Sequence, residues 1–274
     1  MTNDVAAPGQ DSLIRGYRPE ALPLRLLRRE LRDLQTHFPA IRAAKFDFYN
    51  MATRRLGLFA DAEIRLLSRL APVGLALDVG GNWGQSVVAL QRYARPQRIV
   101  TVEPIPFLAE RLRRKYPPGG SVEVLEMGLG LDRGQQLIHV PRYRGYVYDG
   151  IASLDREAAA AWLDPRRMAR FSPAHLTIDT HEVKVERLDA LGIAPDVIKI
   201  DVQGFEGQVI AGGIRTIAAH KPVVIVERPS EAVVAALARL GLAAHGWNGR
   251  KLVAGDLTRN NAIFLGPQHK ALLG

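Results

Sequence analysis

Apolar residues gather in five short runs between positions 75 and 227, and amphipathic stretches separate these runs. Short continuous apolar runs are typical of strands that are buried on both faces of a parallel sheet. The expected strands are 75–79, 98–103, 121–126, 196–202 and 222–227. The expected helices are 85–94, 106–115, 205–219 and 230–240. The alternation predicts an α/β fold with a doubly wound, mostly parallel sheet, because right-handed crossovers place helices on both faces.

The pattern changes near the carboxyl end of the chain. Residues 243–254 contain Asn248-Gly249, a pair that is typical of a type I′ hairpin turn. Residues 262–265 then predict a strand with no helix before it. We therefore expect the sheet to end in antiparallel pairing.

Two amphipathic helices are expected before the first strand. In the first, apolar residues recur at steps of three and four and share one face: Leu24, Leu27, Leu31, Leu34 and Phe38. We expect this face to pack onto the main domain; a dimer seam and a basic helix on a membrane surface are the alternatives. Asp61 is expected to cap a second helix, which ends at Pro72.

The chain is expected to divide into an N-terminal arm with a helical extension, residues 1–71, and a main domain, residues 72–274. Polar residues with glycine and proline over 1–20 predict that the arm is flexible. The main domain is expected to contain an insertion at about 141–182.

Three elements are expected in and beside this insertion. They are a short strand at 136–140, a helix near 155–163 and an edge strand at 181–188. The first and last show apolar residues in strand-like patterns. Tyr143, Tyr146 and Tyr148 lie among arginines, where they form either a surface for stacking a sugar or an ordinary edge hairpin.

Composition limits the class of protein. The hydrophobic fraction of 47% is sufficient for a sizeable core, and the chain has no cysteine, which excludes disulfides and thiolate metal sites. No apolar run approaches the roughly 20 residues needed to span a bilayer. The N-terminus lacks the basic and apolar regions of a signal peptide. These features predict a cytoplasmic protein.

The formal net charge of +9 raises the question of an anionic partner. No run of five like charges appears, and arginine outnumbers lysine. A dispersed basic surface is therefore favoured over a nucleic-acid-binding face.

Four acidic residues follow apolar runs: Asp78, Glu103, Asp201 and Glu227. Ligands of open α/β sheets bind beyond the carboxyl ends of the strands, so we expect these four side chains around one crevice. Glu103 stands where a carboxylate accepts hydrogen bonds from ribose hydroxyls. That role fits both a dinucleotide and S-adenosylmethionine (AdoMet).

The turn after Asp78 distinguishes the two cofactors. A dinucleotide fingerprint requires G-x-G-x-x-G, but Asn82 occupies the position of its second glycine. The glycines of this turn are Gly80, Gly81 and Gly84, and the polar residues Gln85 and Ser86 then open a helix. The turn favours AdoMet, whose amino acid portion would lie against Asn82 and the backbone of Gly80.

Five segments together resemble the FkbM-type methyltransferases. They are D-V-G-G-N-W-G at 78–84, T-V-E-P at 101–104, G-L-G at 128–130, V-E-R-L-D-A-L at 185–191 and I-K-I-D-V-Q-G-F-E at 198–206. The resemblance extends from about Leu75 to Glu227. It implies a Rossmann-like class I methyltransferase fold and AdoMet-dependent O-methylation of a sugar, glycan or polyketide-like metabolite. Gln203 stands where the family usually has glutamate, and Gly81 where alanine is common, a change expected to be harmless.

The resemblance also implies roles for single residues. Asp78, Gly80, Asn82 and Gly84 match the cofactor loop, Glu103 matches the ribose carboxylate, and the region at Met127 would lie near adenine. The complete predicted cofactor site is Asp78, Gly80, Gly81, Asn82, Gly84, Gln85, Ser86, Glu103, Pro104, Met127, Gly128 and Asp201.

Methyl transfer to a hydroxyl requires a base or a metal, because an alcohol is a poor nucleophile near neutral pH. Asp201 is the expected base, with capping of the following helix as its alternative role. Glu227 is expected beside it, where the two carboxylates would share a proton or bind Mg²⁺. His181 is a third catalytic candidate and Glu206 a candidate for stabilising the helix dipole, while Trp83 would line a pocket or pack under the loop.

The sequence leaves four functions open. The leading one is an AdoMet-dependent O-methyltransferase with a small-molecule or glycan acceptor. The alternatives are a nicotinamide-dependent oxidoreductase, a non-catalytic cofactor-binding protein and a nucleic-acid methyltransferase. The last is disfavoured because no N-P-P-Y motif is present. A homodimer is compatible with the sequence.

Overall fold

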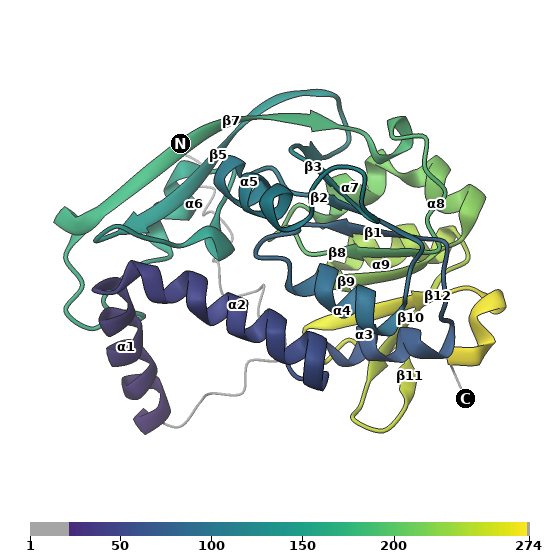
Figure 1. Cartoon of the computed structure of the whole chain (residues 1–274), viewed down its shortest axis with the longest axis horizontal. Coiled ribbons are helices and arrows are strands. Elements are labelled where there is room, and N and C mark those ends of the chain that lie inside the picture. The colour runs from purple at the N-terminus through teal and green to yellow at the C-terminus, as the bar shows by residue number, and fades with distance from the viewer. Residues whose placement is uncertain (1–21, 273–274) are drawn as a thin grey trace, which may run out of the picture.

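The computed structural model describes residues 22–272, so the arm expected over residues 1–20 lies outside the described residues. An eight-stranded sheet forms the centre of the molecule (Figure 1), with strand order β11-β10-β12-β9-β8-β1-β2-β3. Its strands are β1 (Leu75–Val79), β2 (Arg98–Val102), β3 (Val122–Leu125), β8 (Val197–Ile200), β9 (Val223–Glu227), β10 (Ala243–Trp247), β11 (Leu252–Ala254) and β12 (Asn261–Leu265). The five neighbouring strands β9, β8, β1, β2 and β3 pair in parallel. This pairing confirms the predicted doubly wound α/β fold.

The carboxyl end of the chain closes the sheet with antiparallel strands, as predicted. β12 pairs antiparallel with both β9 and β10. The β10–β11 hairpin differs from the prediction, because Trp247 pairs with Leu252 and leaves a four-residue loop. Asn248 closes this loop by accepting hydrogen bonds from the N–H groups of Arg250 and Lys251, so the expected two-residue type I′ turn is wrong.

Helices cover both faces of the large sheet. On one face, α3 (Ala62–Leu66) and α4 (Gln85–Tyr93) pack against Ala76 and its neighbours. On the other, α7 (Glu206–Gly212), α8 (Ile214–His220) and α9 (Glu231–Arg239) pack against Leu77 and its neighbours. Successive residues of β1 thus enter different apolar cores, as the two-residue period of a strand requires. α5 (Pro106–Lys115) follows β2.

The expected helix over 205–219 is divided at Gly213. The preceding Gly212 lies so close to Gly130 that an added Cβ would overlap its carbonyl oxygen, and a Cβ at Gly213 would overlap Leu188. The two glycines therefore let the chain pass close to its neighbours, and the helix breaks there.

A second, four-stranded sheet lies beyond the carboxyl edge of the first, with order β4-β7-β5-β6. Its strands are β4 (Gly128–Leu129), β5 (Gly134–Tyr143), β6 (Tyr146–Val147) and β7 (Leu176–Glu186). The helix predicted near 155–163 is α6 (Arg156–Ala161), and it packs against this sheet. β7 is not the edge strand that the sequence predicted, because it lies between β4 and β5. Two-residue β4 is too short to show a periodic pattern, which explains the error.

Two helices precede the sheet, α1 (Leu22–Thr36) and α2 (Pro39–Leu56). The sequence did not predict α2. The expected apolar packing face of α1 is also wrong, because Leu27, Leu31, Leu34 and Phe38 are exposed, while the side chain of Leu24 is not described. Asp61 does precede α3, but its side chain makes no capping hydrogen bond.

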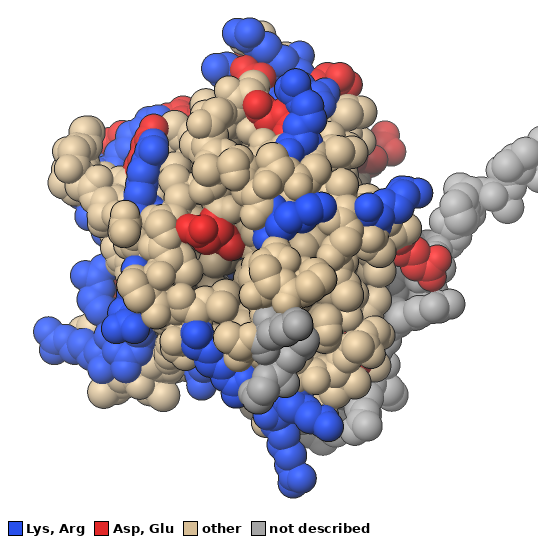
Figure 2. All heavy atoms as spheres, turned by 90° about the vertical axis from the view of Figure 1, so that its right-hand side faces the viewer, with Lys and Arg blue, Asp and Glu red and all other residues tan. Residues whose placement is uncertain are grey.

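Charged groups on one face of the molecule are dispersed. Figure 2 shows the right-hand side of Figure 1, where lysines and arginines are separated by uncharged side chains. None of the helices within residues 22–272 is both long and apolar enough to cross a membrane.

Candidate active site

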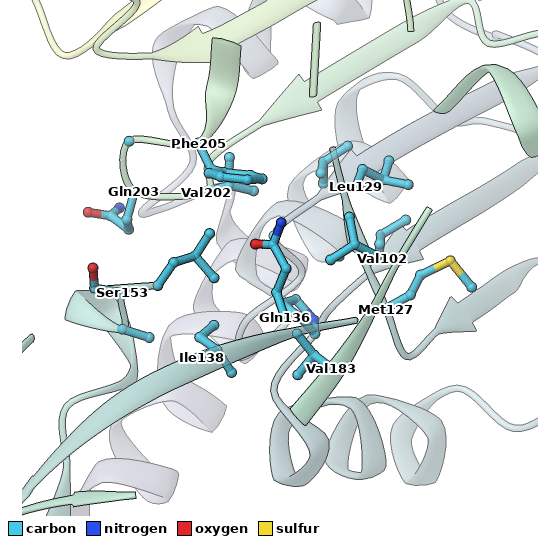
Figure 3. Close-up of a pocket in the computed structure, with 18 of the residues that line it drawn as sticks. Val102, Met127, Leu129, Gln136, Ile138, Ser153, Val183, Val202, Gln203 and Phe205 are labelled. Atoms are coloured by element: carbon cyan, nitrogen blue, oxygen red, sulfur yellow. The ribbon is translucent and has the colours of Figure 1, made fainter. Parts of the chain in front are cut away.

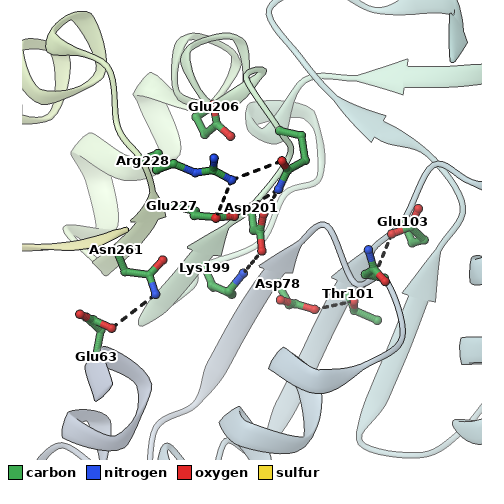
Figure 4. Close-up of polar contacts among 12 residues, drawn as sticks. Glu63, Asp78, Thr101, Glu103, Lys199, Asp201, Glu206, Glu227, Arg228 and Asn261 are labelled. Carbon is green, nitrogen blue, oxygen red and sulfur yellow. Dashed lines mark hydrogen bonds and ion pairs between the residues drawn. The ribbon is translucent and has the colours of Figure 1, made fainter. Parts of the chain in front are cut away.

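The carboxyl ends of four parallel strands bring the predicted acidic residues to one edge of the sheet (Figure 4). Asp78 lies in register with Thr101 of β2 and Lys199 of β8. The hydroxyl of Thr101 donates to Asp78 Oδ2 at 2.8 Å. Asp78 is completely buried, and burial raises its pKa. Its hydrogen bond with Thr101 therefore joins the ends of β1 and β2. Asp78 lines neither of the two cavities at this edge of the sheet.

The glycine turn is required by contacts within the chain. Gly80 has φ +93°, and an added Cβ would overlap the carbonyl oxygen of Asp201. At Gly81 a Cβ would overlap Thr101 Oγ1, which is already held by its hydrogen bond to Asp78. Glycine therefore fits at position 81, where the family commonly has alanine, because a methyl group there would require Thr101 to move. Gly84, with φ +82°, precedes the first residue of α4.

Glu103 holds the turn from the neighbouring strand. Its Oε2 accepts a hydrogen bond from the N–H of Asn82 at 2.8 Å, and its Oε1 accepts one from the N–H of Ile105 at 2.9 Å. Burial raises the pKa of Glu103 to about 7, although both hydrogen bonds oppose the shift. Each carboxylate oxygen has a second lone pair, so these contacts leave acceptor capacity for a ligand hydroxyl.

Asp201 and Glu227 form the centre of a polar network at the ends of β8 and β9 (Figure 4). Gln203 Nε2 donates to Asp201 Oδ1 at 3.0 Å and to Glu227 Oε2 at 3.2 Å. Lys199 Nζ lies 3.0 Å from Asp201 Oδ2, and Arg228 Nη2 lies 2.9 Å from Glu227 Oε1. One amide thus joins two carboxylates, each of which also has its own cation.

The two carboxyl groups have different proton affinities. Burial alone would raise the pKa of Asp201, but the Lys199 ammonium and hydrogen bonds from Glu227 and Gln203 lower it to about 2. Burial and the adjacent Asp201 raise the pKa of Glu227 to about 7, against the opposing charge of Arg228. Below about pH 7 the pair therefore holds one proton, on Glu227, and above that pH both carboxyl groups are ionised.

The alternative of a bound Mg²⁺ gains no support. Among the described residues, no group of three or more His, Asp or Glu side chains is arranged to hold a metal ion. Gln203 Nε2, a donor, faces both carboxylates where a cation would need acceptors.

Gly80 lines a first cavity of about 290 Å³. Figure 3 shows this cavity. Pro104, Met127 and Gly128, which the sequence assigned to the cofactor site, line it. Apolar side chains make up most of the remaining wall, from the large sheet, the second sheet and the turn before α7: Val79, Val102, Leu129, Ile138, Val183, Val185, Val202 and Phe205. The second sheet thus closes this cavity from outside.

Gly80 also lines a second cavity, of about 400 Å³. Its floor contains five predicted cofactor residues and the charged pair of β8: Gly80, Gly81, Asn82, Gln85, Ser86, Lys199 and Asp201. Its outer wall comes from α2 and the loop that follows, through Phe46, Tyr49 and Phe59. Tyr49 and Phe59 stack with ring centroids 4.5 Å apart. This cavity therefore joins the cofactor turn, a carboxylate and an aromatic wall.

Sequence reasoning missed two features of this site. Lys199 is buried beside Asp201, and its signal was a lysine inside an otherwise apolar strand. Burial would lower the pKa of Lys199, but the Asp201 and Asp78 carboxylates raise it above the ordinary value. The aromatic wall from α2 had no such signal, because that helix was not predicted.

Other candidates lie away from the site. His181 is on β7 and lines neither cavity. Glu206 accepts a hydrogen bond from the N–H of Gly204 and thereby closes the turn before α7. Tyr143, Tyr146 and Tyr148 are buried in an apolar cluster with Leu163 and Met168, so of the two alternatives the sugar-stacking surface is wrong. The edge hairpin is confirmed, because β5 pairs with the edge strand β6. Their pattern resembled an exposed surface because the residues that cover them are distant in sequence.

Trp83 packs under the loop instead of lining a pocket. Its ring stacks on Phe46 of α2 with centroids 4.9 Å apart, and its Nε1–H donates to Asp149 Oδ2 at 3.0 Å. Arg42 of α2 pairs with the other oxygen of Asp149, and Asn50 donates to the carbonyl oxygen of Trp83. The indole therefore attaches α2 to the glycine turn and holds the outer wall of the second cavity in place.

Comparisons with known proteins agree with these features. The family model for the methyltransferase FkbM domain matches residues 78–236, which is more than half of the chain. No curated protein matches the chain in sequence. Among solved structures, a methyltransferase FkbM from Methylobacillus flagellatus is 16% identical with a TM-score of 0.43, and the alignment covers 79% of this chain and 47% of that one. This chain thus spans less than half the length of that protein.

A TehB-like SAM-dependent methyltransferase from Corynebacterium glutamicum is 13% identical with a TM-score of 0.37, over 81% of this chain and 98% of that one. The family model begins at Asp78 and includes the cofactor turn, Glu103 and the whole β8–α7 segment with Asp201. The chain belongs to the FkbM methyltransferase family.

Proposed function

We propose that the protein transfers a methyl group from AdoMet to a hydroxyl of a glycan or polyketide-like metabolite. The observation that carries this proposal is the second cavity, which connects the glycine turn and Asp201 to an aromatic wall. A methyltransferase needs these three parts together, because it must hold the cofactor, bind the acceptor and receive the acceptor's proton.

The two cavities fit the two ends of AdoMet. The apolar walls of the first, around Val102, Met127 and Phe205, suit an adenine ring. The polar floor of the second, with Asn82, Gln85 and Ser86 at the start of α4, suits an amino acid with its carboxylate near the helix N-terminus. Gly80 belongs to both cavities, and their volumes lie near the low end of the range of about 300–1,000 Å³ for ligand pockets.

AdoMet supplies a methyl group on a sulfonium, which a nucleophile can displace in line. The chain's own residues orient the acceptor hydroxyl and accept its proton. Asp201 lines the second cavity, and Glu227, with a pKa of about 7, can take up a proton whenever its carboxyl group is ionised. We therefore assign proton acceptance to the pair, with Asp201 in contact with the hydroxyl and Glu227 as the final site of the proton. Lys199 keeps Asp201 ionised and in place.

The acceptor class follows from the wall of the second cavity. Tyr49 and Phe59 offer ring faces, against which the C–H face of a sugar or a flat apolar skeleton packs. An aromatic wall beside the base favours such a metabolite over a polynucleotide, which requires a basic track along its phosphates.

Calorimetry with AdoMet, S-adenosylhomocysteine and NAD tests the cofactor. We expect binding of both methyl cofactors and none of NAD. Binding of NAD alone would overturn the proposal and favour the oxidoreductase.

Transfer of a radiolabelled methyl group tests the reaction. The acceptor panel contains glycosides, hydroxylated polyketides, amines and RNA. We expect label on hydroxyl oxygen of one of the first two classes. Label confined to the amines or to RNA would contradict O-methylation of a metabolite.

A further inference from the structure

Helix α1 turns its polar face toward the protein. Asp33 is completely buried, and its Oδ2 lies 2.8 Å from Arg170 Nη2, which also pairs with Glu30 at 2.9 Å. Arg32 Nη1 donates to the carbonyl oxygen of Arg167 at 2.7 Å, and the Arg32 guanidinium lies 5.0 Å from the ring centroid of Trp162. These contacts fix the rotation of the helix, because turning it would leave a buried carboxylate without its cation.

The apolar face of α1 consequently points away from the protein. Leu27, Leu31, Leu34 and Phe38 are 46–56% exposed, and their spacing places them in one row. A row of four large apolar residues with this exposure differs from the single exposed leucines that are normal on protein surfaces.

The row continues past the corner between the two helices. The N–H of Ile41 donates to the carbonyl oxygen of Phe38 at 3.0 Å, which joins the end of α1 to the first turn of α2. Ile41, Phe48 and Met51 then share an exposed face of α2, and the exposed Phe59 lies beyond its end. We call these eight residues the apolar track: Leu27, Leu31, Leu34, Phe38, Ile41, Phe48, Met51 and Phe59.

The segment that carries the track is also the most basic part of the chain. Residues 22–59 contain eight Lys or Arg and three Asp or Glu, which is +5 of the chain's net charge of +9. An apolar row within a strongly cationic segment is typical of helices that lie in the interface of an anionic bilayer. Two copies of the chain would instead bring like charges together at this surface.

We propose that the apolar track docks the protein on the surface of an anionic membrane, with α1 and α2 in the plane of the interface. Apolar side chains of the track enter the boundary between headgroups and acyl chains, while the exposed cations of the segment, Arg28, Arg54 and Arg55, lie near the anionic headgroups. This inference is independent of the methyl-transfer reaction. Phe59 belongs to both the track and the wall of the second cavity, so a docked molecule presents that cavity to the membrane surface.

Co-sedimentation of the full chain with lipid vesicles tests the proposal. One vesicle contains equal parts of phosphatidylglycerol and phosphatidylcholine, and the other contains phosphatidylcholine alone. We expect partition onto the anionic vesicle to be stronger by about tenfold or more, and to weaken as salt is raised. The double variant Leu31→Gln with Leu34→Gln is expected to reduce partition by about tenfold or more, because both side chains lose their transfer into the interface.

Matched controls separate docking from a general loss of apolar surface. Leu137 on β5 and Ile214 on α8 are 53% and 45% exposed and lie outside the track. Leu137→Gln and Ile214→Gln are expected to leave partition unchanged, and the melting temperatures of all variants show that they fold. Equal losses in controls and track variants, or no partition onto the anionic vesicle, would overturn the proposal.

Sedimentation equilibrium tests whether a second copy of the chain, instead of a membrane, covers the apolar track. A dimer that forms without lipid and dissociates in the Leu31→Gln, Leu34→Gln variant would assign the track to a second copy and overturn membrane docking. We expect the track variants to leave the sedimenting mass unchanged.

Discussion

The two cavities beside Gly80 share one sheet edge but differ in nearly every other respect. The first has walls of valine, leucine and phenylalanine and is closed by the second sheet. The second has a floor of amide, hydroxyl and charged groups and is closed by α2. The parallel strands therefore provide the common base, while two separate additions to the fold decide what each cavity accepts.

Charge explains why the two sites need different walls. An uncharged ring gains from apolar surroundings, whereas a proton transfer requires a carboxylate that is paired when it leaves water. Lys199, which lines the second cavity, and Gln203, which lines the first, are partners of Asp201, and Arg228 is the partner of Glu227. Cofactor affinity and turnover should therefore respond to separate substitutions.

Asp201→Asn should have the largest effect. It removes the carboxylate that we propose contacts the acceptor, so turnover is expected to fall by about 10²–10⁴-fold, the usual contribution of a general base. AdoMet affinity should change little, because the first cavity and the polar side chains of Asn82, Gln85 and Ser86 in the second are intact. Steady-state kinetics and calorimetry measure the two quantities.

The matched control for this substitution lies on the same strand. Asp196 precedes β8 at its other end, where its Oδ2 accepts hydrogen bonds from the N–H groups of Gly74 and Leu75. Asp196→Asn should leave turnover within about twofold, because it is remote from both cavities. If Asp201→Asn instead weakened AdoMet binding and left turnover unchanged, Asp201 would be assigned to the cofactor and not to the acceptor.

The pH dependence of kcat/KM should show a limb near pH 7. Glu227 must be deprotonated for the pair to accept a proton, so activity rises with pH and falls about tenfold one unit below the pKa of about 7. Glu227→Gln should abolish this limb and lower activity above it. Glu103 also has a pKa of about 7, so a limb that survives Glu227→Gln but disappears in Glu103→Gln would point to the cofactor side.

Phe205→Ala tests the first cavity. Loss of the ring from its wall should weaken AdoMet binding by about five- to tenfold, which corresponds to about 1 kcal/mol of aromatic contact. Turnover at saturating AdoMet should remain close to that of the unaltered protein. Phe107→Ala on α5 is the control, because Phe107 lines neither cavity and should leave binding unchanged. An equal loss in both variants would show that the wall has no specific role.

Gln203→Glu should have the smallest effect. A third carboxylate beside Asp201 and Glu227 favours their protonated forms and raises the pKa of the pair. The limb of the pH profile is expected to move up by about one unit, and by less at high salt. A limb that stays in place or moves to lower pH would show that Gln203 does not set the charge of this network.

Some residues of the site could be placed from the sequence, and others could not. Asp78, Glu103, Asp201 and Glu227 could be placed at one edge because parallel strands align their carboxyl ends. The buried tyrosines and His181 could not be placed, since nothing local reveals which distant segment covers a side chain. The crowding around Gly81 could not be foreseen for the same reason, because the atom that excludes a methyl group there belongs to Thr101.

Local periodicity and short motifs were enough to predict the five parallel strands, the antiparallel end, the glycine turn and the family. The second sheet, the aromatic wall from α2 and the outward apolar face of α1 became visible only in the folded molecule. The physical reason is that the orientation of a helix and the cover of a cavity depend on contacts between distant residues. In α1 the ion pairs of Asp33 and Arg170 outweigh the amphipathic pattern, which predicted the opposite orientation.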